Sequence, residues 1–189
     1  SSSPCWRGAR AVPERPARVV LVGFMGSGKS SIGRLVARRL GFRFEDMDRR
    51  IEKRAGRTVA AIFRDSGEEA FRELEREEAR ALSTLRDRVV ATGGGAFARP
   101  DTRAILKEGA LTVWLQCDID TILGRVPADG SRPLAGNRGI MRALLAEREP
   151  SYRMADVAVD ASAGTPREVA DRIVGLIEGR IRGEATARR

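Results

Sequence analysis

Apolar residues follow two patterns along this sequence. Short continuous runs such as Val19–Val22 are typical of strands that are buried on both faces. Elsewhere apolar residues recur every three or four positions, as at Ile32, Leu35 and Val36, which predicts amphipathic helices. We therefore expect strands over 18–22, 42–46, 89–92, 111–115 and 156–160, and helices up to Gly41, over 49–55, 59–65, 68–86, 101–108, 118–125 and 140–149, and from 166 onward.

Strands that alternate with helices predict an α/β fold. We expect three layers, with a five-stranded, mainly parallel sheet between helices on both faces. A single domain should cover residues 18–180, between disordered segments over 1–17 and 181–189. Residues 127–139 are rich in Gly and Pro without a period, which predicts a lid or binding loop. Ligands of such folds bind at the carboxyl ends of the strands.

The composition excludes several classes of protein. The chain has no histidine, so Ser-His-Asp chemistry and histidine-ligated metals are excluded. Its two cysteines, Cys5 and Cys117, form no CxxC pair, which favours a reducing compartment and a cytoplasmic protein. The longest apolar stretch, Val19–Met25, is too short to span a bilayer. We therefore expect no membrane partner.

The net charge of +9 invites a nucleic-acid interpretation, but its distribution argues against one. Residues 1–20 and 180–189 each carry four arginines and one glutamate, and so contribute +3 each. The residues between them keep only +3. The excess lies mostly in the terminal segments, so we expect no nucleic-acid partner. We also expect a monomer that acts on small molecules.

Residues Gly23–Ser30, with the sequence GFMGSGKS, match the phosphate-binding pattern G-x-x-x-x-G-K-[ST] completely. A predicted strand precedes the motif and a predicted amphipathic helix follows it, as the motif requires. Its glycines let backbone N–H groups turn toward an anion at the helix N-terminus. The side chain of Lys29 should then reach the β- and γ-phosphates of a nucleotide, and the Ser30 hydroxyl should ligate Mg²⁺.

The remaining motifs narrow the class of nucleotide-binding protein. The Asn-Lys-x-Asp element of GTPases and the signature of ABC-type ATPases are both missing from the sequence. Over about residues 18–178 the sequence resembles the shikimate kinase family. The blocks that carry the resemblance are, in order, GFMGSGKS at 23–30, DMD at 46–48, GEEAFRELE at 67–75, TGGG at 92–95, RPL at 132–134 and REPSY at 148–152.

This resemblance implies a P-loop NTPase fold like that of nucleoside monophosphate kinases, with ATP as cosubstrate and Mg²⁺ as cofactor. It places Ser30 and Asp46 at the metal, and Asp48 on the substrate hydroxyls, where it could accept the proton of the attacking hydroxyl. Residues two positions apart in a strand lie on the same face, so the carboxylates of Asp46 and Asp48 could both point into one site. Asp48 could equally be the N-cap of the helix over 49–55.

The resemblance also assigns a site for the acidic substrate. Arg72 and Arg148 should bind its carboxylate, because two guanidinium forks fix the orientation of a small acid. Glu75 lies on the same helix face as Arg72 and could orient it, or be an ordinary surface pair. Phe63 and Phe71 could line the pocket or pack in the core. The glycines of the TGGG block should allow close backbone approach to the substrate; they are Gly93, Gly94 and Gly95.

For the nucleotide, the resemblance assigns the loop residues Gly26, Ser27, Gly28, Lys29, Ser30 and Ser31. Arg132, in the predicted lid, should close over ATP and neutralise charge on the transferred phosphoryl group. Arg125 resembles the family residue that stacks on adenine, and Pro166 lies in the adenine-side segment. The catalytic residues implied are Lys29, Asp48 and Arg132. The lid is a few residues shorter than in some family members, and Ser151 stands where leucine is more common.

The activity implied is transfer of the ATP γ-phosphoryl group to the 3-hydroxyl of shikimate, in the biosynthesis of chorismate and aromatic amino acids. Two alternatives stay open at this point. One is a kinase for another small hydroxy acid such as gluconate, which could share the arginine pair. The other is a kinase-like regulatory protein that binds both ligands without turnover.

Overall fold

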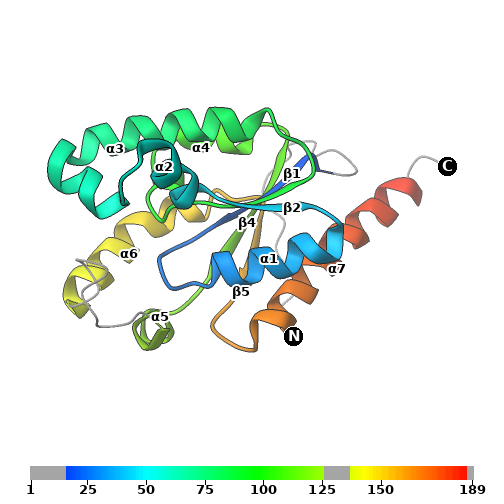
Figure 1. The fold of residues 1–189 in the computed structure, drawn as a ribbon. Coiled ribbons are helices and arrows are strands. Elements are labelled where there is room, and N and C mark those ends of the chain that lie inside the picture. The colour runs from blue at the N-terminus through cyan, green and yellow to red at the C-terminus, as the bar shows by residue number, and fades with distance from the viewer. Residues whose placement is uncertain (1–15, 126–136, 187–189) are drawn as a thin grey trace.

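Five strands form one parallel sheet in the computed structural model, which describes residues 16–125 and 137–186 (Figure 1). The strands are β1 (Arg18–Val22), β2 (Arg43–Asp46), β3 (Arg88–Ala91), β4 (Ala110–Gln116) and β5 (Val157–Asp160). Their order is β2-β3-β1-β4-β5, and each neighbouring pair is parallel. The central position of β1 places the loop after it between the carboxyl ends of β3 and β4.

Helices connect the strands. They are α1 (Lys29–Leu40), α2 (Met47–Ala55), α3 (Val59–Ser83), the 3-10 turn η1 (Ala96–Ala98), α4 (Pro100–Lys107), α5 (Ile119–Arg125), α6 (Arg138–Tyr152) and α7 (Pro166–Thr186). The sequence signals for their ends are confirmed. Gly41 ends α1 in the left-handed region, and Thr58 caps α3 by accepting a hydrogen bond from the Ala61 N–H at 3.2 Å.

Alternate residues of β1 enter two separate apolar cores, one on each face of the sheet. Val19 and Leu21 pack with α1 and α7, whereas Val20 and Val22 pack with α2, α3, α4 and α6. Figure 1 shows α1 and α7 on one side of the sheet and α2, α3 and α4 on the other. The predicted three-layer α/β fold is therefore confirmed.

Several predicted boundaries were wrong. The break expected between the helices over 59–65 and 68–86 is confirmed at Gly67, where φ is 79° and ψ 174°, but the second part ends at Ser83 instead of 86. Helix α6 begins at Arg138, two residues inside the predicted loop, because the Asn137 side chain caps it. Helix α7 continues to Thr186, past the domain boundary expected at 180. None of the helices in the described ranges is both long and apolar enough for a membrane span.

Candidate active site

The loop after β1 turns on glycines with positive φ. Gly23, Gly26 and Gly28 have φ of 141°, 76° and 93°, which side chains rarely allow. Gly28 is the N-cap of α1, and no side chain caps that end of the helix. The first-turn N–H groups of α1 are therefore left to an external acceptor, and the partial positive charge of the helix end favours an anion there.

The ammonium group of Lys29 lies against this loop. Its Nζ donates to the backbone oxygens of Gly23 at 2.8 Å and Phe24 at 2.7 Å, and lies 3.5 Å from Oγ of the buried Ser27. The backbone oxygens of the loop thus hold the Lys29 ammonium group in place. A phosphate bound to the loop would meet the positive charge of Lys29 beside the helix end, as predicted.

The candidate metal ligands meet as expected. The Ser30 hydroxyl donates to Oδ2 of Asp46 at 2.7 Å, so a hydroxyl and a carboxylate share one point beside the loop. No cluster of three or more acidic or cysteine side chains suited to a metal occurs among the described residues. Two oxygen ligands fit Mg²⁺, which commonly keeps water and phosphate oxygens as its other ligands. These residues therefore fit the implied ion.

The geometry expected for Asp48 was wrong in two respects. Strand β2 ends at Asp46 and α2 begins at Met47, so Asp46 and Asp48 do not share a strand face. The N-cap of α2 is Asp46, whose Oδ1 accepts a hydrogen bond from the Arg49 N–H at 3.3 Å. Asp48 lies in the first helical turn instead, and its carboxylate approaches the glycine turn after β3.

The glycine turn over 93–95 is the meeting point of the predicted acid site. None of its glycines has a positive φ, so the backbone angle does not require glycine here. Space does. At Gly93, an added Cβ would lie 2.6 Å from Asp48 Oδ1 and 2.8 Å from Glu75 Oε1. At Gly94 it would lie 3.5 Å from Arg148 Nη1, and at Gly95 it would lie 2.5 Å from Arg72 Nη1. Side chains from α2, α3 and α6 thus converge on one turn.

Arg72 is held in place by carboxylates of its own helix. Its Nη1 donates to Glu75 Oε2 at 2.8 Å, and its Nη2 donates to Glu68 Oε1 at 2.9 Å. Glu75 is only 1% exposed, which rules out the ordinary surface pair and confirms that it orients Arg72. Burial raises the pKa of Glu75, and the negative charge of Asp48 adds to the rise, while the Arg72 guanidinium opposes it.

Two aromatic rings flank the same arginine. The guanidinium carbon of Arg72 lies 5.9 Å from the centroid of Phe63 and 5.5 Å from that of Phe71. The two rings are 4.7 Å apart, and Phe71 is buried. Phe71 packs in the core with Phe63 against it, and both rings also lie beside the Arg72 guanidinium, so the core interpretation is confirmed.

Arg148 approaches the glycine turn from α6. Its guanidinium carbon lies 5.9 Å from the ring centroid of Phe24, a residue of the phosphate-binding loop. One helical turn later, the hydroxyl of the buried Tyr152 donates a hydrogen bond to the backbone oxygen of Gly94. The sequence analysis gave no role to Tyr152 or Phe24. The i, i+4 spacing of Arg148 and Tyr152 was the available signal.

The predicted adenine-side residues lie on the β5 side of β4, away from β1 and the glycine turn. Arg125, at the end of α5, donates to the backbone oxygens of Ala161 at 3.0 Å and Ser162 at 3.5 Å, in the loop after β5. Pro166 begins α7 at the end of that loop and is exposed. Arg132 and most of the predicted lid lie outside the described residues.

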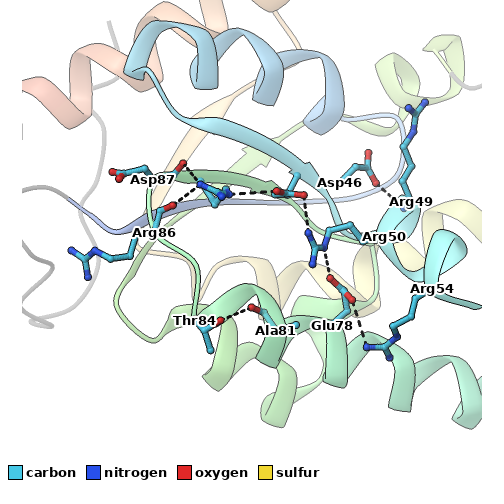
Figure 2. Close-up of polar contacts among 11 residues, drawn as sticks. Asp46, Arg49, Arg50, Arg54, Glu78, Ala81, Thr84, Arg86 and Asp87 are labelled. Carbon is cyan, nitrogen blue, oxygen red and sulfur yellow. Dashed lines mark hydrogen bonds and ion pairs between the residues drawn. The ribbon is translucent and has the colours of Figure 1, made fainter.

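An open hollow of about 670 Å³ lies beside Asp46, between α1, β2, α2 and α3. Figure 2 shows that its polar walls pair with one another. Arg50 of α2 bonds Glu45 of β2 at 3.0 Å and the buried Glu78 of α3, which Arg54 also approaches. This network ties the helix that carries Asp48 to the helix that carries Arg72.

A loop of the phosphate-binding type and a turn that two arginines approach, both at the carboxyl edge of a parallel sheet, are the features expected of a P-loop kinase that acts on a small molecule. The comparisons with known proteins are more specific. The family model described as "Shikimate kinase" matches residues 25–178. The chain belongs to the shikimate kinase family.

Curated relatives and solved structures agree. The chain is 42% identical to the shikimate kinase of Geobacter sulfurreducens over 88% of this chain and 94% of that one. It is 43% identical to that of Moorella thermoacetica, over 86% and 98%. A structure of shikimate kinase from Acinetobacter baumannii in complex with shikimate superposes with a TM-score of 0.83, at 36% identity, over 87% and 94%. A gluconokinase from Sinorhizobium meliloti, at 20% identity and TM-score 0.59, shares the fold alone.

Proposed function

We propose that this chain transfers the γ-phosphoryl group of ATP to the 3-hydroxyl of shikimate. One observation carries the proposal: the acid site and the phosphate site adjoin each other at Gly94. A Cβ added at Gly94 would lie 3.5 Å from both Arg148 Nη1 and the backbone nitrogen of Met25 in the phosphate-binding loop. An acid held by the arginines would therefore present its hydroxyls toward the terminal phosphate. The relative crystallised with shikimate supports this choice of acid.

Each residue has a chemical role in this proposal. Arg72 and Arg148 bind the carboxylate from two helices, which fixes the orientation of the ring. Lys29 and the uncapped amides of α1 hold the phosphates and stabilise charge that develops in the transition state. Ser30 and Asp46 would hold Mg²⁺, which when bound neutralises the phosphate oxygens.

Asp48 is placed to orient the attacking hydroxyl or to accept its proton. Its carboxylate lies against Gly93, on the same turn that Arg72 and Arg148 approach. Phosphoryl transfer through a loose transition state needs little assistance from a base, so positioning is the larger part of this role. The assignments of Arg132 and the adenine-side residues rest on the family resemblance, and the contacts of Arg125 are compatible with the latter.

The proposal is tested by a coupled assay of ADP release with shikimate, with gluconate and with no acceptor. We expect ADP release that depends on shikimate, with gluconate close to the background. Turnover on gluconate equal to that on shikimate would establish the other hydroxy-acid kinase. Binding of ATP and shikimate without ADP above background would establish the regulatory alternative. A Lys29→Ala sample, purified in parallel, controls for contaminating kinases.

A further inference from the structure

Tyr152 is a buried polar residue at the end of α6, and the proposed reaction gives it no task. Its side chain is completely buried and packs 6.3 Å, between ring centroids, from Trp114 of β4. Its hydroxyl donates to the backbone oxygen of Gly94, 58 residues away in sequence. The tyrosine thus connects the end of α6 to the middle of the glycine turn.

The same hydroxyl also faces Arg148. Arg148 precedes Tyr152 by one helical turn, so the two side chains leave the same face of α6. Arg148 Nη1 in turn lies 3.5 Å from the position of a Cβ on Gly94. Tyr152 and Arg148 therefore meet the same residue of the turn, the tyrosine through its hydrogen bond to the Gly94 oxygen and the arginine through its place beside Gly94.

The phenol keeps its proton under ordinary conditions. Burial raises the pKa of Tyr152 to about 12, although the nearby Arg148 charge opposes the rise. The hydroxyl consequently remains a donor to Gly94 across the neutral pH range. A phenylalanine would fill nearly the same space but would leave the Gly94 oxygen without this hydrogen-bond donor.

We propose that Tyr152 is a positioning residue for the acidic substrate, which fixes Arg148 against the Gly94 turn at the distance that a bound carboxylate requires. The inference rests on the proposed function, because it assumes that Arg148 binds the carboxylate. A purely structural Tyr152 would contribute to folding and leave the affinity for the acid unchanged. The two roles predict different measurements.

The Tyr152→Phe variant separates these roles. We expect KM for shikimate to rise about tenfold, while KM for ATP stays within about twofold of the wild type and kcat falls much less than KM rises. Thr112→Val is the matched control. Its buried hydroxyl bonds the Asp156 carboxylate at 2.7 Å at the other end of β4, so its loss should lower the melting temperature and leave KM for shikimate unchanged.

A double-mutant cycle tests the route through Arg148. Arg148→Ala should raise KM for shikimate strongly, and adding Tyr152→Phe to it should cause little further change. A full tenfold effect in the Arg148→Ala background, or a Tyr152→Phe variant that loses only stability, would overturn the inference. An unchanged KM in Arg148→Ala would instead contradict the proposed function, so the two failures can be told apart.

Discussion

At the scale of single residues, the site depends on glycines that leave room for functional side chains. Gly95 is the sharpest case, because a Cβ there would lie 2.5 Å from Nη1 and 2.8 Å from Nη2 of Arg72. The collision involves the end of a long side chain, which can move aside more easily than backbone can. The cost therefore falls on the position of Arg72 rather than on the fold.

We expect Gly95→Ala to raise KM for shikimate at least about tenfold with little change in melting temperature, because Arg72 is displaced from the carboxylate. Steady-state kinetics and thermal unfolding measure both. Gly94→Ala is the comparison, since its Cβ would make ordinary contact at 3.5 Å. Equal effects of the two substitutions on KM would argue against displacement of Arg72.

Glu75 should make stability depend on pH. Its folded-state pKa is raised above the ordinary 4.5, chiefly by burial, so the folded chain binds this proton more tightly than the unfolded chain does. Its contribution to the free energy of unfolding is therefore greatest below pH 4.5 and declines as pH rises through the raised pKa.

The Glu75→Gln variant cannot titrate at this position. Between about pH 4 and about pH 7, the free energy of unfolding of the wild type should thus fall relative to that of Glu75→Gln. Denaturant unfolding of both proteins across this range gives the difference. A difference that is constant, or that grows in favour of the wild type, would show that the Arg72 ion pair outweighs burial.

Motifs identified most residues of the site, but not their geometry. The sequence brought Ser30 and Asp46 together correctly. It could not tell which aspartate caps α2, because that depends on the residue at which β2 ends. Tyr152 belongs to the REPSY block at 148–152, but the sequence indicated no role for it. Its partner is the backbone oxygen of Gly94, 58 residues away, and no local pattern predicts such a contact.

At the scale of elements, Gly67 controls the direction of α3. Its φ of 79° and ψ of 174° interrupt the helix just before Glu68 and Arg72, and nothing lies within 4 Å of an added Cβ. Gly67→Ala therefore tests backbone strain without a clash. We expect a loss of about 1–3 kcal/mol in the free energy of unfolding, measured with denaturant.

Gly175→Ala provides the control for this substitution. Gly175 lies inside α7, also with nothing within 4 Å of an added Cβ, but without a positive φ. Alanine there should stabilise the chain by about 0.5–1 kcal/mol, because it restricts the unfolded state and favours helix. Destabilisation of similar size at both positions would contradict the strain at Gly67.

Elements were predictable where hydrophobic period and caps agree, as in α1 with Gly41 and α3 with Thr58. Errors gathered at boundaries. The break expected near Gly67 is confirmed by its non-helical φ and ψ, whereas α3 ends at Ser83, three residues before the predicted end.

At the scale of the whole molecule, the alternation of strands and helices along the sequence predicted the class of fold, but it did not predict the order of the strands in the sheet. The sheet order β2-β3-β1-β4-β5 depends on pairings such as Val19 with both Val89 and Leu111, which are distant in sequence. That order has a functional result. It sets the loop after β1 beside the turn after β3, so that the proposed phosphate site and the proposed acid site adjoin each other.

Two touching sites on different elements should still bind their ligands through separate residues. Each ligand stabilises the fold by mass action, with about 2.7 kcal/mol at one hundred times its Kd. For a chain of this length that corresponds to a rise in melting temperature of about 5–10 °C. We expect Lys29→Ala to lose most of the rise caused by ADP and to keep the rise caused by shikimate.

Arg148→Ala should behave in the opposite way in the same thermal unfolding experiment, because Arg148 belongs to the acid site and Lys29 to the phosphate loop. Lys53→Ala, which removes an exposed lysine of α2, serves as the control and should keep both rises. If Arg148→Ala abolished the ADP rise and spared the shikimate rise, the arginine would belong to the nucleotide. The assignment of Lys29 to the phosphate site and of Arg148 to the acid site would then be wrong.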